Sequence, residues 1–155
     1  MSPALRDELR QTRPFKSLEQ EAYLNLLRTT AVLTDAFELV LKPVGITPQQ
    51  FNVLRILRGA EPEGLCRNEL RDRMLSRMPD MTRLLDRMEE AGLVIRERGD
   101  RDRRLVRTHI TPRGLEILAA LDDKVAAEHA RSLGHLTEEQ LRTMVALLTL
   151  ARGAP

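Results

Sequence analysis

The chain is poor in the residues that crosslink a fold or anchor it in a membrane. Its single cysteine, Cys66, excludes an internal disulfide and favours a reducing compartment. The longest apolar run, near MVALLTLA, is too short to cross a bilayer. The N-terminal stretch MSPALRDELRQTRPFK is charged throughout, which a signal peptide would not be. We therefore expect a soluble, cytoplasmic protein with no membrane partner.

The sequence also lacks the motifs of catalysis and metal binding. It has no nucleophile motif, no glycine-rich phosphate loop and no convincing pair of catalytic acids. No two of the histidines (His109, His129 and His135) are spaced i,i+3 or i,i+4, so no helix face presents two metal ligands. We predict that the protein is not an enzyme and carries no cofactor and no metal. Glu128 beside His129 is the one alternative for a metal ion.

What the chain has instead is arginine, concentrated in its middle. The formal net charge is +2, from 25 basic and 23 acidic residues. Residues 67–113 contain thirteen arginines against nine acidic residues, so this segment carries +4 and the rest of the chain −2. Such an asymmetry indicates a surface that binds nucleic acid.

Start and stop signals predict two helices in the first part of the chain. The first begins at Ser17, where Gln20 completes a capping-box pattern, and ends before Pro43. It spans roughly 24 residues, or about 36 Å. A helix this long, with apolar residues on more than one side, is expected to pack beyond its own domain. TPQQ at 47–50 starts a second helix, which ends at Gly59.

The arginine-rich segment predicts a helix-turn-helix followed by a hairpin. A short helix over about 67–74 and a second from Pro79 to Ala91 are joined by a tight turn, and the second is amphipathic. LVIRER (93–98) and LVRTHI (105–110) then favour near-alternate aliphatic and β-branched residues, which predicts two strands of a β-hairpin. A helix-turn-helix followed by a hairpin is a winged helix.

Two further helices complete the predicted fold. Thr111 and Pro112 start one that ends near Gly134, and TEEQ at 137–140 is a capping box for the last. The fold class is therefore mainly α with a small β-hairpin wing. The winged helix lies between N- and C-terminal helices that must bury their apolar faces elsewhere.

Three stretches of this pattern carry a family resemblance: TPQQFNVLRIL (47–57), PDMTRLLDRMEEAGLV (79–94) and DRDRRLVRTHITPRG (100–114). Over nearly its whole length the chain resembles the multiple-antibiotic-resistance-regulator (MarR) family of bacterial transcription factors. The resemblance implies a homodimer with one winged helix per subunit. It also implies a recognition helix in the major groove of duplex DNA, a wing-tip arginine in the minor groove, and a small-molecule effector or oxidant that tunes DNA affinity.

The resemblance also assigns the ends of the chain to dimerisation. It implies three regions: an N-terminal arm and long dimerisation helix (1–45), a winged helix-turn-helix DNA-binding domain (46–111) and C-terminal dimerisation helices (112–155). The residues expected at the dimer interface are Phe15, Leu18, Ala22, Leu26, Leu133, Leu141, Met144 and Leu148.

The first turn of the recognition helix supplies the expected base contacts. Arg83 can bridge guanine O6 and N7, and Thr82 can either donate to a phosphate or touch a thymine methyl group. Asp80, beside Pro79, can accept from cytosine N4 or simply cap the helix. Arg87 lies one turn on, near the DNA backbone or paired with a neighbouring acid.

Other arginines are expected to contact the DNA backbone or the minor groove. Arg67 and Asn68 begin the preceding helix and Arg77 lies in the turn, where all three suit phosphate contacts. The hairpin tip carries further arginines, which can enter a narrow minor groove or pair with Asp100 and Asp102. These tip residues are Arg101, Arg103 and Arg104.

These features together predict a ligand-responsive repressor that binds pseudo-palindromic duplex DNA. Two rivals stay open. The first is an oxidant-sensing regulator that uses Cys66, which precedes a helix but has no internal resolving partner and is otherwise a buried small residue. The second is a winged-helix protein-interaction module that no longer binds DNA, against which the arginine-rich tip argues.

Overall fold

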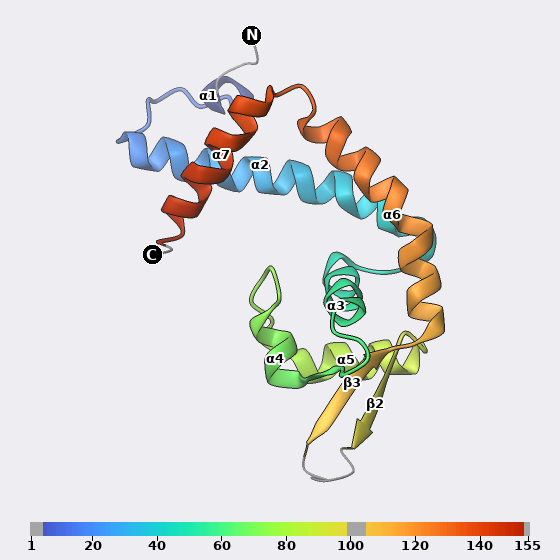
Figure 1. The fold of residues 1–155 in the computed structure, drawn as a ribbon. Coiled ribbons are helices and arrows are strands. Elements are labelled where there is room, and N and C mark those ends of the chain that lie inside the picture. Colours follow the sequence, from blue (N-terminus) through green and yellow to red (C-terminus); the bar gives the residue numbers. More distant parts are fainter. Residues whose placement is uncertain (1–4, 99–104, 154–155) are drawn as a thin grey trace.

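The computed structural model describes residues 5–98 and 105–153 (Figure 1). In chain order its elements are α1 (Leu5–Glu8), α2 (Leu18–Leu41), the 3₁₀ turn η1 (Lys42–Val44), α3 (Pro48–Arg58), β1 (Leu65–Cys66), α4 (Arg67–Asp72), α5 (Met81–Glu90), β2 (Val94–Arg98), β3 (Val106–Ile110), α6 (Pro112–Leu133) and α7 (Glu138–Ala151). This is the mainly helical winged helix-turn-helix that the sequence predicts.

Side-chain caps start α2, α3, α6 and α7 where the sequence signals predict them. Thr47 and Thr137 form complete capping boxes with Gln50 and Gln140. At α2 the Ser17 hydroxyl accepts from the Gln20 amide at 3.2 Å, but the Gln20 side chain accepts from the amide of Lys16. The predicted capping box of α2 is therefore only half formed, although the helix has its predicted 24 residues.

Details of the helix-turn-helix and of two short elements differ from the sequence-based prediction. Pro79 does not begin the recognition helix: Asp80 is its N-cap, because the carboxylate accepts from the amide of Arg83 at 3.0 Å, and α5 starts at Met81. Helix α4 ends at Asp72 rather than Met74. The sequence pattern also gave no sign of the short elements α1 and β1, which are too short to show a periodicity.

The wing is a three-stranded antiparallel sheet with the order β1-β3-β2. Strands β2 and β3 form the predicted hairpin, in a register that runs from Val94 opposite Ile110 to Arg98 opposite Val106. Strand β1 pairs with the other edge of β3, where Leu65 lies opposite Thr108. This added strand ties the base of the wing to the start of α4.

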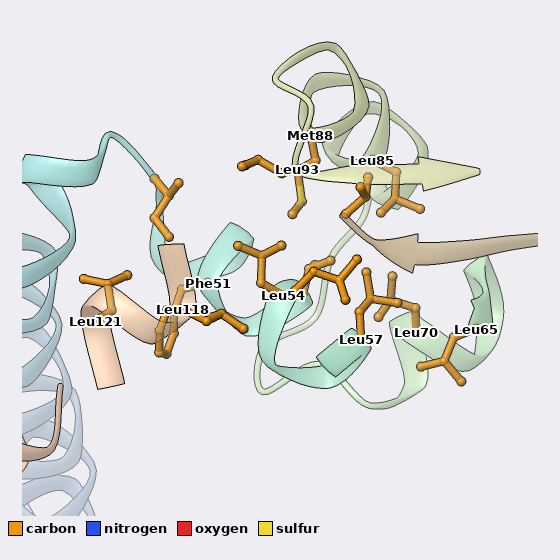
Figure 2. Close-up of a cluster of buried hydrophobic side chains, with 14 of the residues drawn as sticks. Phe51, Leu54, Leu57, Leu65, Leu70, Leu85, Met88, Leu93, Leu118 and Leu121 are labelled. Atoms are coloured by element: carbon orange, nitrogen blue, oxygen red, sulfur yellow. The ribbon is translucent and has the colours of Figure 1, made fainter. Parts of the chain in front are cut away.

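Helix α3 lies at the centre of the hydrophobic core (Figure 2). Val53, Leu54 and Leu57 are fully buried. Figure 2 shows leucines of α4, α5 and α6 converging on this helix. The core therefore joins the helix-turn-helix to α6 in one packed cluster.

A bidentate ion pair strengthens the junction of α3 with α6. The guanidinium of Arg58 donates to both carboxylate oxygens of Asp122, at 2.8 and 3.1 Å. These hydrogen bonds are the main cause of a lowered pKa of Asp122. Both side chains are partly exposed, so the pair acts as an orienting contact more than as a large source of stability.

The remaining helices extend away from the wing. Helix α2 packs along α6, and Figure 1 shows α1 and α7 at the opposite end of the molecule from the hairpin. No helix within residues 5–98 and 105–153 combines the length and apolarity that crossing a bilayer would require.

The first turn of α6 approaches the wing so closely that only glycine fits at position 114. A Cβ atom there would lie 2.6 Å from the Leu93 carbonyl oxygen and 2.7 Å from Cγ1 of Ile110. We expect Gly114→Ala to lower the free energy of unfolding by about 1–3 kcal/mol through overpacking. Urea denaturation at one fixed protein concentration measures the change as a lower midpoint at unchanged slope.

Gly59→Ala is the matched control. Its Cβ would meet nothing nearer than the Ile56 carbonyl oxygen at 3.6 Å, and the φ of Gly59 is −77°. We expect its free energy of unfolding to stay within about 0.5 kcal/mol of the wild-type value. Equal losses in the two variants would contradict the steric explanation.

Candidate nucleic-acid interface

The recognition helix α5 has one buried and one exposed face. Met81, Leu85 and Met88 are buried against the core, which leaves Thr82, Arg83 and Arg87 exposed on the other side. The spacing of the apolar residues therefore fixes which side chains can reach a groove. The structure exposes every described residue of the predicted DNA-binding set: Arg67, Asn68, Arg77, Pro79, Asp80, Thr82, Arg83 and Arg87.

Among the described residues, no acidic side chain forms an ion pair with the guanidinium groups that α5 and the preceding turn expose on this face. Within the described ranges, no carboxylate lies within 4 Å of the guanidinium of Arg77, Arg83 or Arg87. The alternative in which Arg87 pairs with a neighbouring acid is therefore not found in this part of the chain. These groups keep their charge and donors for an external partner.

A hydrogen bond joins the two helices of the helix-turn-helix on the same face. Nη1 of Arg67, the first residue of α4, donates to Oγ1 of Thr82 at 3.0 Å. Asn68 follows on α4, and Arg77 lies in the connecting turn. The structure thus brings Arg67 and Thr82 together, whereas Asp80 is engaged as the helix cap.

Arg96 links the recognition helix to the wing, a role that the sequence did not reveal. Its guanidinium contacts Glu89 at 2.6 Å and Asp86 at 2.7 Å, and its backbone amide donates to Glu89 at 2.9 Å. Hydrogen bonding to Arg96 is the main cause of a lowered pKa of Glu89, and bonding to Glu89 raises the pKa of Arg96. The available signal was a pair of acids on α5, Asp86 and Glu89, that lie ten and seven positions before Arg96.

Arg107 is also turned away from the recognition face. Its Nη1 donates to the carbonyl oxygen of Gly64 at 3.0 Å and lies 3.8 Å from Glu69. Arg96 and Arg107 therefore serve the sheet and its junctions. The thirteen arginines of residues 67–113 therefore include two structural residues as well as those that face outward.

The tip of the wing lies outside the described residues. Strand β2 ends at Arg98 and the described chain resumes at Leu105, so the contacts expected of the tip arginines stay predictions. These are Arg101, Arg103 and Arg104.

Cys66 has a local structural role at the start of α4. Its amide donates to Oε2 of Glu69 at 2.8 Å, and this bond is the main cause of a lowered pKa of the Glu69 carboxyl. The thiol is half-buried rather than fully buried. Sensing of oxidants through Cys66 stays a prediction.

The described residues contain no group of three or more His, Cys, Asp or Glu side chains that could hold a metal ion. Glu128, the alternative metal ligand, is instead hydrogen-bonded to Arg131 at 2.7 and 2.8 Å and to Ser132 at 2.6 Å. Its pKa is lowered, chiefly by the hydrogen bonds from Arg131.

A pocket of about 500 Å³ opens where α2, α3, α6 and the α4–α5 turn meet. The rings of Phe37 and Phe51 meet edge to face at 5.3 Å, and the ring of His129 is stacked on Phe37 at 6.2 Å. The pocket is lined by Thr30, Leu33, Thr34, Phe37, Pro48, Gln49, Phe51, Asn52, Arg55, Leu75, Ser76, Glu128, His129, Ser132 and Leu133. The sequence alone did not locate it, because its lining comes from segments far apart in the chain.

Apolar side chains are exposed at the end of the molecule opposite the wing. Of the predicted interface residues, Leu18, Ala22 and Leu26 are exposed on α2; the others, half-buried, are Phe15, Leu133, Leu141, Met144 and Leu148. Further large apolar residues exposed on α2 and α7 are Tyr23, Leu27, Val32, Leu39, Val145, Leu147 and Leu150.

Comparison with known proteins identifies this arrangement. Residues 44–105, which include α3, β1, α4, α5 and β2, match the model of the MarR family. The chain is 31% identical over 123 residues to an HTH-type transcriptional repressor from Mycobacterium tuberculosis, covering 79% of this chain and 87% of that protein.

Solved structures give the same result. The crystal structure of a MarR transcription factor from Planctomyces limnophilus has 39% identity and a TM-score of 0.67, over 88% of this chain and 99% of that one. The MepR–DNA complex from S. aureus shares the fold, with 24% identity and a TM-score of 0.77 over 86% and 98% of the two chains. The chain therefore belongs to the MarR family of transcriptional regulators.

Proposed function

We propose that this protein is a homodimeric, ligand-responsive repressor that binds pseudo-palindromic duplex DNA. The observation that carries the proposal is the exposed face of α5, where Arg83 and Arg87 lie free of described carboxylates beside the Arg67–Thr82 pair. The repressor from Mycobacterium tuberculosis and the MepR–DNA complex support this function by their names. In this proposal residues 46–111 bind DNA, and residues 1–45 and 112–155 form the dimer.

The proposed mode of binding places α5 in the major groove and the wing against the adjacent minor groove. Arg83, in the first turn, reads base edges, whereas Arg67, Asn68 and Arg77 contact phosphates. The Arg96 bridge supports this division because it fixes α5 to strand β2, so helix and wing meet the duplex as one unit. A two-fold dimer would place its half-sites about one helical turn apart.

Dimerisation is proposed through the apolar surfaces of α2 and α7. Leu18 is 77% exposed and Leu150 is 71% exposed, which is costly for large aliphatic side chains gathered at one end of a monomer. A second copy of the chain would cover them and set the spacing between two recognition helices.

The pocket between α2, α3 and α6 supports regulation by a small molecule. Its rings (Phe37, Phe51 and His129) suit a planar aromatic ligand, and Arg55 at its wall suits an anionic group. Leu75 and Ser76 of the α4–α5 turn also line it. A ligand in the pocket would therefore contact the turn of the helix-turn-helix directly.

The division between base and backbone contacts can be measured in two variants. We expect Arg83→Ala to cost about 1–3 kcal/mol on the operator and to relax base preference there. Arg101→Ala should weaken binding evenly across sequences and lower the slope of log affinity against log salt by about one per subunit. Titration of selected genomic fragments and unrelated duplexes at several salt concentrations checks both; equal loss of discrimination in the two variants would contradict the assignment.

The dimer is tested by placing a charge on the apolar surface of α2. We expect Leu18→Asp to shift the protein from dimer to monomer, because a carboxylate would be buried without a partner. Sedimentation equilibrium gives the mass. Ile95→Asp is the control: Ile95 is also exposed, on β2 of the wing, and this variant should stay dimeric. A wild-type monomer at micromolar concentration would refute the dimer.

The pocket is tested with two aromatic probes of the same shape, anionic benzoate and neutral benzamide. We expect calorimetry to show that benzoate binds more tightly than benzamide. Arg55→Met should lower the ratio of these two affinities about tenfold, because a charged hydrogen bond is lost. Arg28→Met is the control, since Arg28 lies outside the pocket and pairs with Glu8. If Arg55→Met left the preference intact, the anionic group would bind elsewhere.

A further inference from the structure

The hydroxyl group of Thr82 has its hydrogen-bonding role restricted by Arg67. Nη1 of Arg67 donates to Oγ1 of Thr82 at 3.0 Å, so this oxygen acts as an acceptor toward a permanently charged donor. The hydroxyl hydrogen must then point away from the guanidinium. A hydroxyl that already accepts from a cation is also polarised and becomes a better donor.

Within the described part of the protein, no group accepts that hydrogen. Other hydroxyls do have an acceptor: Oγ1 of Thr111 donates to the Gly92 carbonyl at 2.7 Å, and Oγ1 of Thr149 to the Val145 carbonyl at 2.9 Å. Thr82 is exposed in the first turn of α5, at the margin of the buried face that Leu85 occupies one turn later. Its donor is thus available to an external acceptor.

The surroundings of Thr82 favour an electron-rich partner. Thr82, Arg67 and Asn68 line a hollow of about 420 Å³ between α4, α5 and the sheet. Arg96 at its wall is already neutralised by Asp86 and Glu89, whereas Arg67 has no carboxylate partner among the described residues. The guanidinium of Arg67 therefore places a positive charge without a described counter-ion directly beside the Thr82 hydroxyl, and this charge attracts an acceptor atom that carries negative charge.

We infer that Thr82 contacts DNA as a hydrogen-bond donor held in position by Arg67, and not through its methyl group. The acceptor is a phosphate oxygen or an acceptor atom on a base edge. Arg67 is the positioning residue, acting through the 3.0 Å bond to Oγ1. The inference rests on the proposed DNA binding and adds to it the chemical role of one side chain and its dependence on another.

The donor role separates two conservative substitutions at one site. Thr82→Val keeps the shape and the methyl group but has a second methyl group in place of the hydroxyl, and Thr82→Ser keeps the hydroxyl but has no methyl group. We expect Thr82→Val to lose about tenfold in affinity for a selected genomic operator, the size expected for a hydrogen bond to a charged or strongly polar acceptor. Thr82→Ser should bind within about twofold of wild type. Equal losses in the two variants, or wild-type affinity in Thr82→Val, would overturn the inference.

The source of the acceptor follows from a second duplex of the same length and unrelated sequence. A phosphate acceptor predicts that Thr82→Val loses the same factor on both duplexes, and a base acceptor predicts a loss on the operator alone. Either result supports the donor role. Wild-type protein that binds neither duplex would overturn the proposed function and this inference together, whereas wild-type binding that Thr82→Val leaves unchanged would overturn the inference alone.

The positioning role of Arg67 requires a double-mutant cycle. In an Arg67→Met background, Thr82→Val should cost about threefold or less, because the hydroxyl is no longer aligned. Arg71→Met is the matched control: Arg71 lies on the same helix and pairs with Asp72 at 3.3 Å, so the tenfold loss should persist there. The same loss in both backgrounds would refute the positioning role. Unchanged urea midpoints would show that all variants are folded.

Discussion

The burial of α3 on several sides is the constraint on which the rest of the structure depends. Val53, Leu54 and Leu57 have no exposed surface, because α2, α4, β3 and α6 pack against this helix and the buried side chains of α5 belong to the same core cluster. Each of these elements buries an apolar face only while α3 is in place. The parts that face DNA and the parts that extend toward the chain ends therefore share a single core, with the Arg58–Asp122 pair at its edge.

Much of the fold could be predicted because its signals are local. Capping residues three positions from a partner, such as Thr47 with Gln50, mark helix starts from a few adjacent letters, and alternation in residues 93–98 and 105–110 marks the hairpin. Of the two misses, the first depends on a distant segment and the second on a choice between two adjacent helix-start signals. Strand β1 has two residues and exists only because β3 lies beside it, and α5 begins at Met81 because the Asp80 carboxylate satisfies the helix amides.

The candidate site shows the same limit. Its chemistry was predictable, and membership of the MarR family confirms the prediction of a regulator rather than an enzyme. A sequence does not show which charged side chains are paired with one another inside the fold. Arg96 and Arg83 have the same side chain, yet one is bound by Asp86 and Glu89 and the other faces outward. Likewise the pocket lined by Phe37, Phe51 and His129 is formed only by tertiary packing.

Helix α6 has a mechanical consequence because it is long and its first half is fixed in the core. Its first half is fixed to the core by Leu118 and Leu121, both fully buried, and it then continues to Leu133 before the chain reaches α7. A rod of 22 residues is about 33 Å long. Tilting its base by about 5° displaces its far end by about 3 Å, so α6 is a lever arm that converts a sub-ångström rearrangement near the wing into a displacement of several ångströms at the opposite pole.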